Sequence, residues 1–337
     1  MPLRIGINGF GRIGRQVFAH LLSCGELVEI VAINDITDAK TLAHLLKYDS
    51  NYGIFPGNVG AEGNFLKVNG KLFPIFSEKS PENIPWKQMG VDYVLECTGI
   101  FTRRSEAEAH LKQGVRRVII SAPSEDADAT IIVGINENIF QPEKHRVISN
   151  ASCTTHCLAA VAKALNDAFG IEYGLVSTTH AYTNDQRILD LPHKDLRRAR
   201  AAALSIIPTS TGAAKAIHLV IPELQGKMHG IALRVPVSVV SLLDLVALLK
   251  VPTTEEEVNQ AFLRASRTYL YKVLDITFEP LVSTDFKKNP HSAIVDGLST
   301  MVKGNLVKVL AWYDNEWGYA YHLADLAIWL GKAENLL

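Results

Sequence analysis

The stretch Ile5-Gly6-Ile7-Asn8-Gly9-Phe10-Gly11-Arg12-Ile13-Gly14-Arg15 decides the fold of the first half of the chain. It passes from an apolar strand pattern into an amphipathic helix pattern through Gly9-x-Gly11-x-x-Gly14. Glycines at this spacing allow a tight turn, close approach of the backbone to a pyrophosphate and close packing of the helix on the strand. The helix start at Arg12 and Ile13 faces the negative charge of such a ligand. The motif therefore predicts a dinucleotide-binding unit.

A second strand pattern at 28–33 supports this prediction, because it ends in Asn34-Asp35 about twenty residues after the last glycine. An acidic side chain at this place accepts hydrogen bonds from a free ribose 2′-hydroxyl and repels a 2′-phosphate. No Lys or Arg follows in 36–39 to hold such a phosphate. We expect Asp35 to bind the ribose and the cofactor to be NAD. The alternative is that Asn34-Asp35 is only a solvated turn.

Strand and helix patterns alternate through the first 150 residues, which favours a doubly wound parallel sheet of the Rossmann type. The expected strands are 3–8, 28–34, 93–96, 118–121, 131–133 and 147–149, and the expected helices are 12–22, 38–47 and 105–113. Longer strand patterns then follow, separated by wide loops, at 173–180, 229–236, 242–250 and 307–313. We predict an NAD-binding domain at 1–150, an α+β catalytic domain at 151–316, and a closing helix within 317–337 that packs back on the first domain.

The composition excludes several classes of protein. The chain has 337 residues, and its 34 Lys and Arg nearly balance its 35 Asp and Glu, which speaks against a dedicated nucleic-acid-binding protein. No apolar run reaches membrane-spanning length, and we see no export signal at the N-terminus. The four cysteines show no zinc-like spacing, so we expect no metal site. Reduced thiols fit a cytoplasmic protein best.

Cys153 is the candidate nucleophile, because it lies in Ser149-Asn150-Ala151-Ser152-Cys153-Thr154-Thr155-His156-Cys157 and a long helical pattern starts directly after it. Ser152 is a suitable N-cap. A thiolate at a helix start is stabilised by unpaired N–H groups and by the macrodipole. The alternative is an inert buried cysteine.

Of the eleven histidines, His180 is best placed to serve this thiol, since it ends a strand pattern and precedes a polar loop. Imidazole can exchange a proton with a thiol near neutral pH. From spacing alone, a purely structural histidine is the more frequent alternative.

Further ordered motifs extend along the chain. They are 7–15, Lys47-Tyr48-Asp49-Ser50, Ile119-Ile120-Ser121-Ala122-Pro123, the Cys153 motif, His180-Ala181-Tyr182-Thr183, 206–215 and Trp312-Tyr313-Asp314-Asn315-Glu316. Through them the chain closely resembles the phosphorylating glyceraldehyde-3-phosphate dehydrogenases over essentially its whole length. The resemblance implies oxidation and phosphorylation of glyceraldehyde 3-phosphate with inorganic phosphate and NAD, through a hemithioacetal and an acyl thioester on Cys153.

The resemblance also implies roles for individual residues. It makes Cys153 the nucleophile and His180 its partner, and it implies that Asn315 binds the carboxamide of the nicotinamide. The cofactor-binding candidates are then Gly9, Gly11, Arg12, Ile13, Gly14, Asp35, Lys79, Ser121 and Asn315. Two anion sites, for the substrate phosphate and for inorganic phosphate, are implied, and the substrate-binding candidates are Ser152, Thr154, Thr183, Arg198, Thr211, Gly212 and Arg234.

The basic stretch 187–200 is interpreted as a subunit contact, since in the resembling family this loop lines a neighbour's cofactor pocket in a homotetramer. The chain departs from the family pattern at Lys79, Cys97 and His156 and at 237–240. His156 either perturbs the pKa of Cys153 or is a tolerated surface substitution, and both remain open. The rival functions are an erythrose-4-phosphate dehydrogenase, a non-phosphorylating aldehyde dehydrogenase and a non-catalytic scaffold on the same fold.

Overall fold

The computed structural model describes residues 1–337 and divides them into two compact units. Unit 1 comprises Met1–Val133, Glu137–Ala151 and Ala320–Leu337, and unit 2 comprises Gly134–Asn136 and Ser152–Tyr319. None of the helices combines the length and the apolar run that crossing a bilayer requires.

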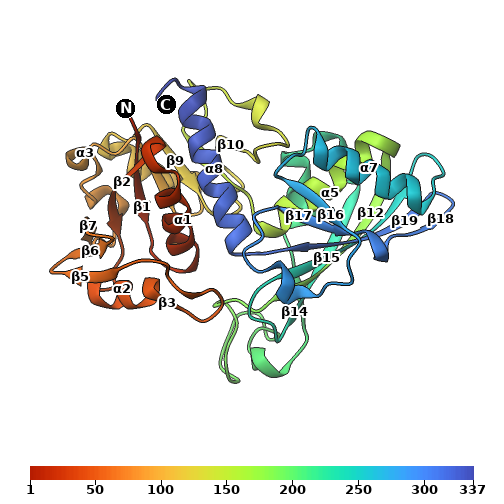
Figure 1. Cartoon of the computed structure of the whole chain (residues 1–337), viewed down its shortest axis with the longest axis horizontal. Coiled ribbons are helices and arrows are strands. Elements are labelled where there is room, and N and C mark those ends of the chain that lie inside the picture. Colours follow the sequence, from red (N-terminus) through yellow and green to blue (C-terminus); the bar gives the residue numbers. More distant parts are fainter. The chain divides into compact units, whose positions relative to one another are not determined.

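Unit 1 is built on a nine-stranded sheet with the order β10-β11-β9-β8-β1-β2-β7-β6-β5 (Figure 1). The strands from β10 to β7 pair in parallel, and β6 and β5 extend the sheet as an antiparallel ribbon. Their bounds are β1 Leu3–Asn8, β2 Val28–Asn34, β5 Val59–Glu62, β6 Phe65–Val68, β7 Lys71–Phe76, β8 Tyr93–Glu96, β9 Arg117–Ile120, β10 Ala129–Thr130 and β11 Val147–Ser149. The strand order reverses next to β1, so the predicted doubly wound fold is confirmed.

The helices of unit 1 connect these strands. They are α1 Arg12–Ser23, α2 Ala39–Lys47, the single turns α3 Trp86–Met89 and α4 Arg104–Ala107, and the C-terminal α8 Trp317–Ala333, whose first residues belong to unit 2. The helix expected at 105–113 is one α-turn followed by a 3₁₀-helix at Glu108–Gln113. The strand expected at 131–133 lies earlier, at Ala129–Thr130. The ribbon β5–β7 and the small hairpin of β3 Tyr48–Asp49 and β4 Gly53–Ile54 were not expected.

Helix α8 packs on the sheet of unit 1, where its buried face joins the core formed by β1 and α1. The apolar residues that α8 contributes are Ala320, Leu323, Ala324, Leu326, Ala327 and Leu330. Directly after the helix, the carboxylate of Glu334 accepts hydrogen bonds from Arg117 on β9 and from the hydroxyl of Tyr93 on β8. Apolar packing and a buried ion pair therefore hold the C-terminal segment on the sheet.

Unit 2 is an eight-stranded mixed sheet with the order β13-β14-β12-β15-β19-β17-β16, and β18 pairs with β19. The strands are β12 Ile171–Ala181, β13 Ile207–Ser210, β14 Met228–Val235, β15 Ser241–Leu249, β16 Leu274–Thr277, β17 Ala293–Asp296, β18 Met301–Lys303 and β19 Leu306–Tyr313. The helices are α5 Cys153–Phe169, the single turn α6 Ala213–Ala216 and α7 Glu255–Arg267. The mixed pairing confirms the predicted α+β class.

Candidate active site and cofactor pocket

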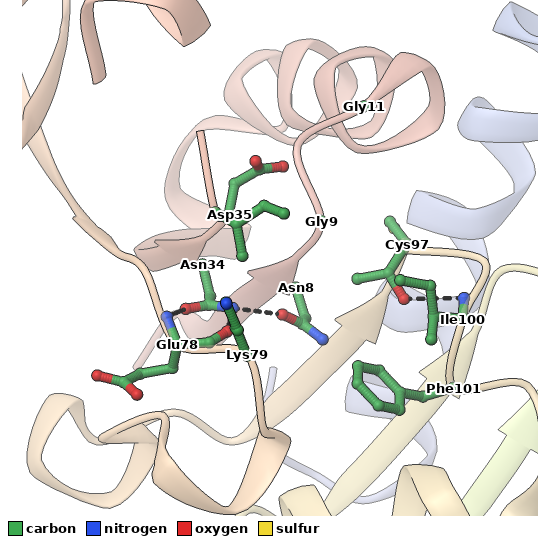
Figure 2. A pocket seen from close by; sticks show the side chains of 12 residues that line it. Asn8, Gly9, Gly11, Asn34, Asp35, Glu78, Lys79, Cys97, Ile100 and Phe101 are labelled. Atoms are coloured by element: carbon green, nitrogen blue, oxygen red, sulfur yellow. Dashed lines mark hydrogen bonds between the residues drawn. The ribbon is translucent and has the colours of Figure 1, made fainter. Parts of the chain in front are cut away.

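A cavity of about 380 Å³ lies in unit 1 at the carboxyl ends of the central strands (Figure 2). Its lining residues follow β1, β2, β7 and β8 and are Asn8, Gly9, Gly11, Asn34, Asp35, Ile36, Glu78, Lys79, Cys97, Thr98, Ile100 and Phe101. This is the point at which the strand order reverses, where open α/β sheets bind their ligands.

The glycine turn at this cavity fits a dinucleotide. Gly9 has a φ of +90°, and a Cβ there would lie 2.7 Å from the backbone N of Thr98. A Cβ on Gly14 would lie 2.1 Å from the carbonyl oxygen of Gly9, so α1 can approach the turn only with glycine at this position. A Cβ on Gly11 would meet no protein atom within 4 Å and would instead take up cavity space. The three glycines therefore leave open a backbone cradle that side chains would fill.

Asp35 is held rigidly at the edge of this cradle. One carboxylate oxygen accepts a hydrogen bond from the Phe10 N–H at 2.7 Å, and the other accepts from the Thr37 N–H at 2.9 Å. Each oxygen keeps a further lone pair that can accept a hydroxyl proton of a ribose. Lys79 supplies the one positive charge in the lining.

Several predicted cofactor residues do not line the cavity. Arg12 forms an ion pair with Asp49 at 2.5 Å, and Ile13 lies beside it in the first turn of α1. Ser121 reaches the cavity only indirectly, through a contact with the thiol of Cys97. Asn315 belongs to unit 2.

The cavity has a polar floor that was not predicted from the sequence. Glu96, which is buried, accepts hydrogen bonds from Asn8 Nδ2 at 2.5 Å and from the Thr98 N–H at 2.8 Å. Behind it, His110 Nε2 lies 3.0 Å from the same carboxylate, and His110 Nδ1 accepts from the Trp86 indole N–H at 2.9 Å. The available signal was positional, because Asn8 and Thr98 lie at or just after the ends of neighbouring parallel strands.

In unit 2, Cys153 is the first residue of α5, as the sequence predicts. Ser152 is confirmed as the N-cap, since its hydroxyl accepts a hydrogen bond from the Thr155 N–H at 3.1 Å. The Sγ atom of Cys153 lies 3.5 Å from Nε2 of His180, near the end of β12. Helix α5 and strand β12 therefore bring the two residues together.

The two ring nitrogens of His180 have different contacts. Nδ1 lies 2.7 Å from the carbonyl oxygen of Ala181, which can only accept, and it also contacts the guanidinium of Arg234, which can only donate, so these contacts favour opposite protonation states of Nδ1. Nε2 faces the thiol of Cys153. In the tautomer that carries its proton on Nδ1, Nε2 can act as a general base for this thiol.

The charge state of the pair differs from the sequence expectation. Burial raises the pKa of the Cys153 thiol, and the positive charge of Arg234 offsets this effect only in part. Burial, together with the same arginine, lowers the pKa of His180 to about 3. The expectation of an acidified thiol at the helix start is therefore wrong for the chain alone, because desolvation outweighs the helix terminus. These directions favour a neutral thiol beside a neutral imidazole at neutral pH.

Tyr313 packs behind the pair and was missed as a site residue, although it lies in a quoted motif. Its ring makes an edge contact with the imidazole of His180, with ring centroids 6.1 Å apart. Its hydroxyl lies 2.9 Å from Thr154 Oγ1 and 2.8 Å from Thr178 Oγ1. The Thr154 hydroxyl is thus engaged in the interior, and Ser152 Oγ is engaged with Thr155.

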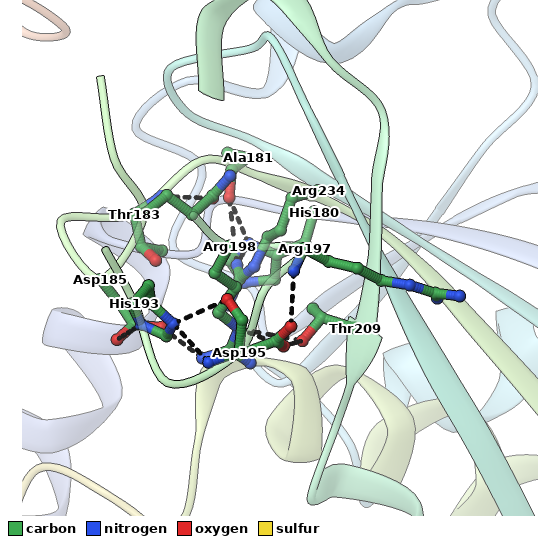
Figure 3. A network of polar contacts seen from close by, with 11 residues as sticks. His180, Ala181, Thr183, Asp185, His193, Asp195, Arg197, Arg198, Thr209 and Arg234 are labelled. Carbon is green, nitrogen blue, oxygen red and sulfur yellow. Dashed lines mark hydrogen bonds and ion pairs between the residues drawn. The ribbon is translucent and has the colours of Figure 1, made fainter. Parts of the chain in front are cut away.

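Arg234 and Arg198 belong to one polar network beside His180 (Figure 3). Arg198 pairs with the carboxylate of Asp185, donates to Thr209 Oγ1 at 2.9 Å and lies 3.5 Å from Asp195. Arg234 contacts His180 Nδ1 and donates to the carbonyl oxygen of Ala181 at 3.1 Å, without a carboxylate partner. Arg234 therefore keeps its charge for an anion, whereas Arg198 is largely neutralised.

The other predicted anion ligands lie on loops of unit 2. The Thr183 N–H donates to Gln186 Oε1 at 3.1 Å. Thr211 Oγ1 accepts from the Ala213 N–H at 3.2 Å, and Gly212 directly precedes α6. Thr211 and Gly212 make no hydrogen bond to the Arg234 network.

His156 lies inside unit 2, with 2% of its surface exposed. Its ring makes an edge contact with Tyr319, and its Nδ1 lies 3.4 Å from Ser292 Oγ. The interpretation as a surface substitution is therefore wrong.

Comparison with known proteins gives one consistent result. Residues 3–104 match the family model described as glyceraldehyde 3-phosphate dehydrogenase, NAD binding domain, and residues 152–315 match that of the C-terminal domain. The chain is 55% identical over 333 residues to a glyceraldehyde-3-phosphate dehydrogenase of Geobacillus stearothermophilus, covering 98% of this chain and 99% of the relative. It is 54% identical over 327 residues to glyceraldehyde-3-phosphate dehydrogenase 2 of Bacillus subtilis, covering 97% and 96%.

Proposed function

Because the chain belongs to the glyceraldehyde-3-phosphate dehydrogenase family, we propose that Cys153 is its nucleophile and His180 its general base. The protein is an NAD-dependent oxidoreductase that converts D-glyceraldehyde 3-phosphate and inorganic phosphate to 1,3-bisphosphoglycerate. One observation carries the proposed roles: the 3.5 Å approach of Sγ to Nε2 of His180.

The steps follow from this geometry. Nε2 of His180 takes the thiol proton, the sulfur of Cys153 bonds to the aldehyde carbon, and His180 returns the proton to the new alkoxide oxygen to give a hemithioacetal. His180 then accepts the hemithioacetal hydroxyl proton as the carbon loses a hydride and becomes a thioester. When bound, NAD supplies the acceptor for this hydride. Phosphate attacks the thioester carbonyl, the carbon–sulfur bond breaks and the acyl phosphate leaves. The sulfur of Cys153 takes up the proton that phosphate loses, and His180 releases its proton to solvent, which restores the starting pair.

We propose that the cavity of unit 1 holds the cofactor, because its glycine cradle and the fixed carboxylate of Asp35 suit a pyrophosphate and a ribose. Lys79 would approach the adenosine end and Asn315 the nicotinamide carboxamide. The roles of Arg12, Ile13 and Ser121 are indirect, since they support the walls of the cavity. We propose domain limits of 1–150, 151–316 and 317–337 for cofactor binding, catalysis and the closing helix.

For the substrate phosphate we propose Arg234 as the main ligand, since it lies half-buried beside His180 without a carboxylate partner. The other proposed ligands of the two phosphates are Ser152, Thr154, Thr183, Arg198, Thr211 and Gly212. Backbone N–H groups at the starts of α5 and α6 would add to these side chains.

We further propose a homotetramer in the cytoplasm. Two apolar surfaces of unit 2 support subunit contacts. One is the sheet face with Tyr173 and Leu175, which are 65% and 66% exposed, and the other is the 186–206 loop with Ile188 and Leu196, which are 82% and 81% exposed. A catalytic thiol is preserved in a reducing compartment, which supports the location.

The test is NADH formation from glyceraldehyde 3-phosphate and NAD, with and without inorganic phosphate. Cys153→Ser should lose turnover, and the matched control Cys157→Ser, one helical turn further into α5, should retain it. Phosphate-dependent turnover that disappears only in Cys153→Ser supports the proposal. Turnover that is indifferent to phosphate, or that occurs only with erythrose 4-phosphate, would overturn it.

A further inference from the structure

The structure contains a hydroxyl that the proposed mechanism does not use. Ser241 is the first residue of β15, it is 1% exposed, and β15 lies between β12 and β19 in the sheet of unit 2. It is in register with Tyr313 on β19, and the next residue, Leu242, is in register with Thr179 on β12. Ser241 therefore stands between the strand that carries His180 and the strand that leads to Asn315.

Its side chain bridges these two strands. Ser241 Oγ accepts a hydrogen bond from the Ala181 N–H at 3.1 Å, and it lies 2.9 Å from Oδ1 of Asn315. A hydroxyl has a single proton, and leaving that proton unpaired in a buried place is costly. The proton therefore goes to the Asn315 oxygen, and the NH2 group of the amide is the end that remains for a ligand. No other hydrogen bond within the chain involves the Asn315 side chain.

We propose that Ser241 is a positioning residue for cofactor binding, which fixes the Asn315 amide so that its NH2 group binds the nicotinamide carboxamide oxygen. This inference rests on the proposed contact between Asn315 and the nicotinamide. The same bridge also reaches the base, because the Ala181 carbonyl oxygen lies 2.7 Å from His180 Nδ1 and the Ala181 N–H donates to Ser241. Ser241 therefore connects Asn315 to the backbone that contacts His180.

The backbone on both sides of this bridge is constrained. Val240, directly before Ser241, is buried and has a φ of +70°, which a β-branched residue adopts only when the surrounding structure imposes it. On the other side, Asp314 accepts hydrogen bonds from the N–H groups of Lys288 at 2.9 Å and of Trp317 at 2.9 Å. The backbone positions of Ser241 and Asn315 are therefore fixed, and the Ser241 hydroxyl determines how the side-chain amide of Asn315 is rotated.

The experiment is titration calorimetry of the full chain with NAD and with ADP-ribose, which lacks the nicotinamide. Ser241→Ala should weaken NAD binding about tenfold, the usual effect of one lost hydrogen bond to an oriented group, and should change ADP-ribose binding less than twofold. Ser241→Thr, which keeps the hydroxyl, should restore the affinity for NAD. If Ser241→Ala does not fold, Ser241→Cys keeps the volume but donates weakly, and the same expectation applies to it.

The orientation itself has a separate test. The analogue with an acetyl group in place of the carboxamide keeps the oxygen and lacks the NH2 group. The wild-type chain should bind this analogue within about threefold of NAD, because Asn315 donates to the oxygen. Rejection of the analogue by the wild-type chain would overturn the inference.

Two controls separate this inference from the proposed function. If Asn315→Ala weakens NAD binding but Ser241→Ala does not, the inference is wrong and the role of Asn315 stands. If Ser241→Ala weakens NAD and ADP-ribose equally, the residue is merely structural and the inference is again overturned. If Asn315→Ala leaves NAD binding unchanged, the proposed role of Asn315 fails and the inference fails with it.

Discussion

Replacing Glu334 by Gln tests how the C-terminal segment is held on unit 1. Arg117 Nε and Nη2 each lie 2.5 Å from a Glu334 oxygen, and the Tyr93 hydroxyl donates to the same carboxylate. The side chains of Arg117 and Glu334 are only 4% and 10% exposed. Gln keeps the size of the side chain but removes its charge. The guanidinium then stays buried with only the carbonyl oxygens of His145 and Pro142 and one amide oxygen.

The magnitude follows from this burial. Breaking a buried ion pair by removing one partner costs about 3–5 kcal/mol. The lower end applies, because the remaining carbonyl oxygens and the new amide oxygen still accept hydrogen bonds from Arg117. A loss of about 3 kcal/mol should lower the thermal unfolding midpoint by about 6–12 °C.

The assay is thermal unfolding followed by circular dichroism between pH 3 and pH 8. Burial raises the pKa of Glu334, but hydrogen bonds from Arg117 and Tyr93 and the charge of Arg117 outweigh it and hold the pKa below its usual range. A lowered folded pKa stabilises the fold above the pKa of the unfolded carboxyl, and this stabilisation disappears as the pH falls through the folded pKa. The difference between wild type and Glu334→Gln should be complete at pH 7 and should shrink below about pH 4.

A matched control removes the same charge from an exposed pair of unit 1. Glu62 and Lys67 lie 3.0 Å apart with side chains 61% and 48% exposed, so Glu62→Gln should leave the midpoint unchanged. A midpoint of Glu334→Gln within 1 °C of wild type would refute the reasoning, and so would a difference that stays constant down to pH 3.

Three further predictions concern the cofactor cradle and the thiol. Asp35→Ser should lower kcat/KM for NAD about tenfold or more, since a charged hydrogen-bond acceptor for the ribose is lost. The ratio of kcat/KM for NAD to kcat/KM for NADP should therefore fall, and an unchanged ratio would contradict this role of Asp35. Gly14→Ala should lower the thermal unfolding midpoint, because its Cβ would meet a carbonyl oxygen at 2.1 Å. Gly11→Ala should leave the midpoint unchanged, because its Cβ would meet no protein atom, but it should weaken the binding of ADP-ribose as measured by calorimetry. Alkylation of Cys153 by iodoacetamide should accelerate as the pH rises above neutrality, because burial raises the pKa of the thiol. Arg234→Gln should slow the alkylation at every pH below that pKa, because the positive charge of Arg234 lowers the thiol pKa. An alkylation rate already at its plateau at pH 6 would contradict this prediction and show that the thiolate is stabilised in the chain.

The elements that the sequence predicts well are those whose signal is local. The glycine turn, strand β1 and the N-cap Ser152 each depend on residues within a few positions, and all three are confirmed. The prediction of a single helix at 105–113 was wrong, because the segment is divided between α4 and a 3₁₀-helix. Its one fully buried polar residue, His110, contacts the carboxylate of Glu96 in the interior. That pairing joins residues fourteen positions apart and is invisible to periodicity.

The site shows the same limit. Position along the chain predicts that Cys153 starts a helix, but the pKa of its thiol depends on burial by the folded unit, which no neighbour in sequence reveals. Of the cavity residues, Asn8 ends β1 and Thr98 follows β8, and only the parallel pairing of these two strands brings them to one floor. Ser241 and Asn315 are 74 residues apart, so their hydrogen bond follows from the order of β12, β15 and β19 alone.

Ala181 takes part in this site only through its main chain. Its N–H donates to Ser241, its C=O accepts from Arg234 and contacts His180 Nδ1, and its methyl group takes no part in these contacts. A mutational scan that replaces side chains one at a time would therefore report only the effect of side-chain volume at position 181. It would not detect the hydrogen bonds that the main chain of Ala181 makes. Replacing the backbone N–H of Ala181 by an ester oxygen, through chemical synthesis or genetic-code expansion, would delete this hydrogen-bond donor and leave every side chain intact. Part of what specifies this enzyme is thus carried by the polypeptide backbone, where no change among the twenty amino acids other than proline can remove it.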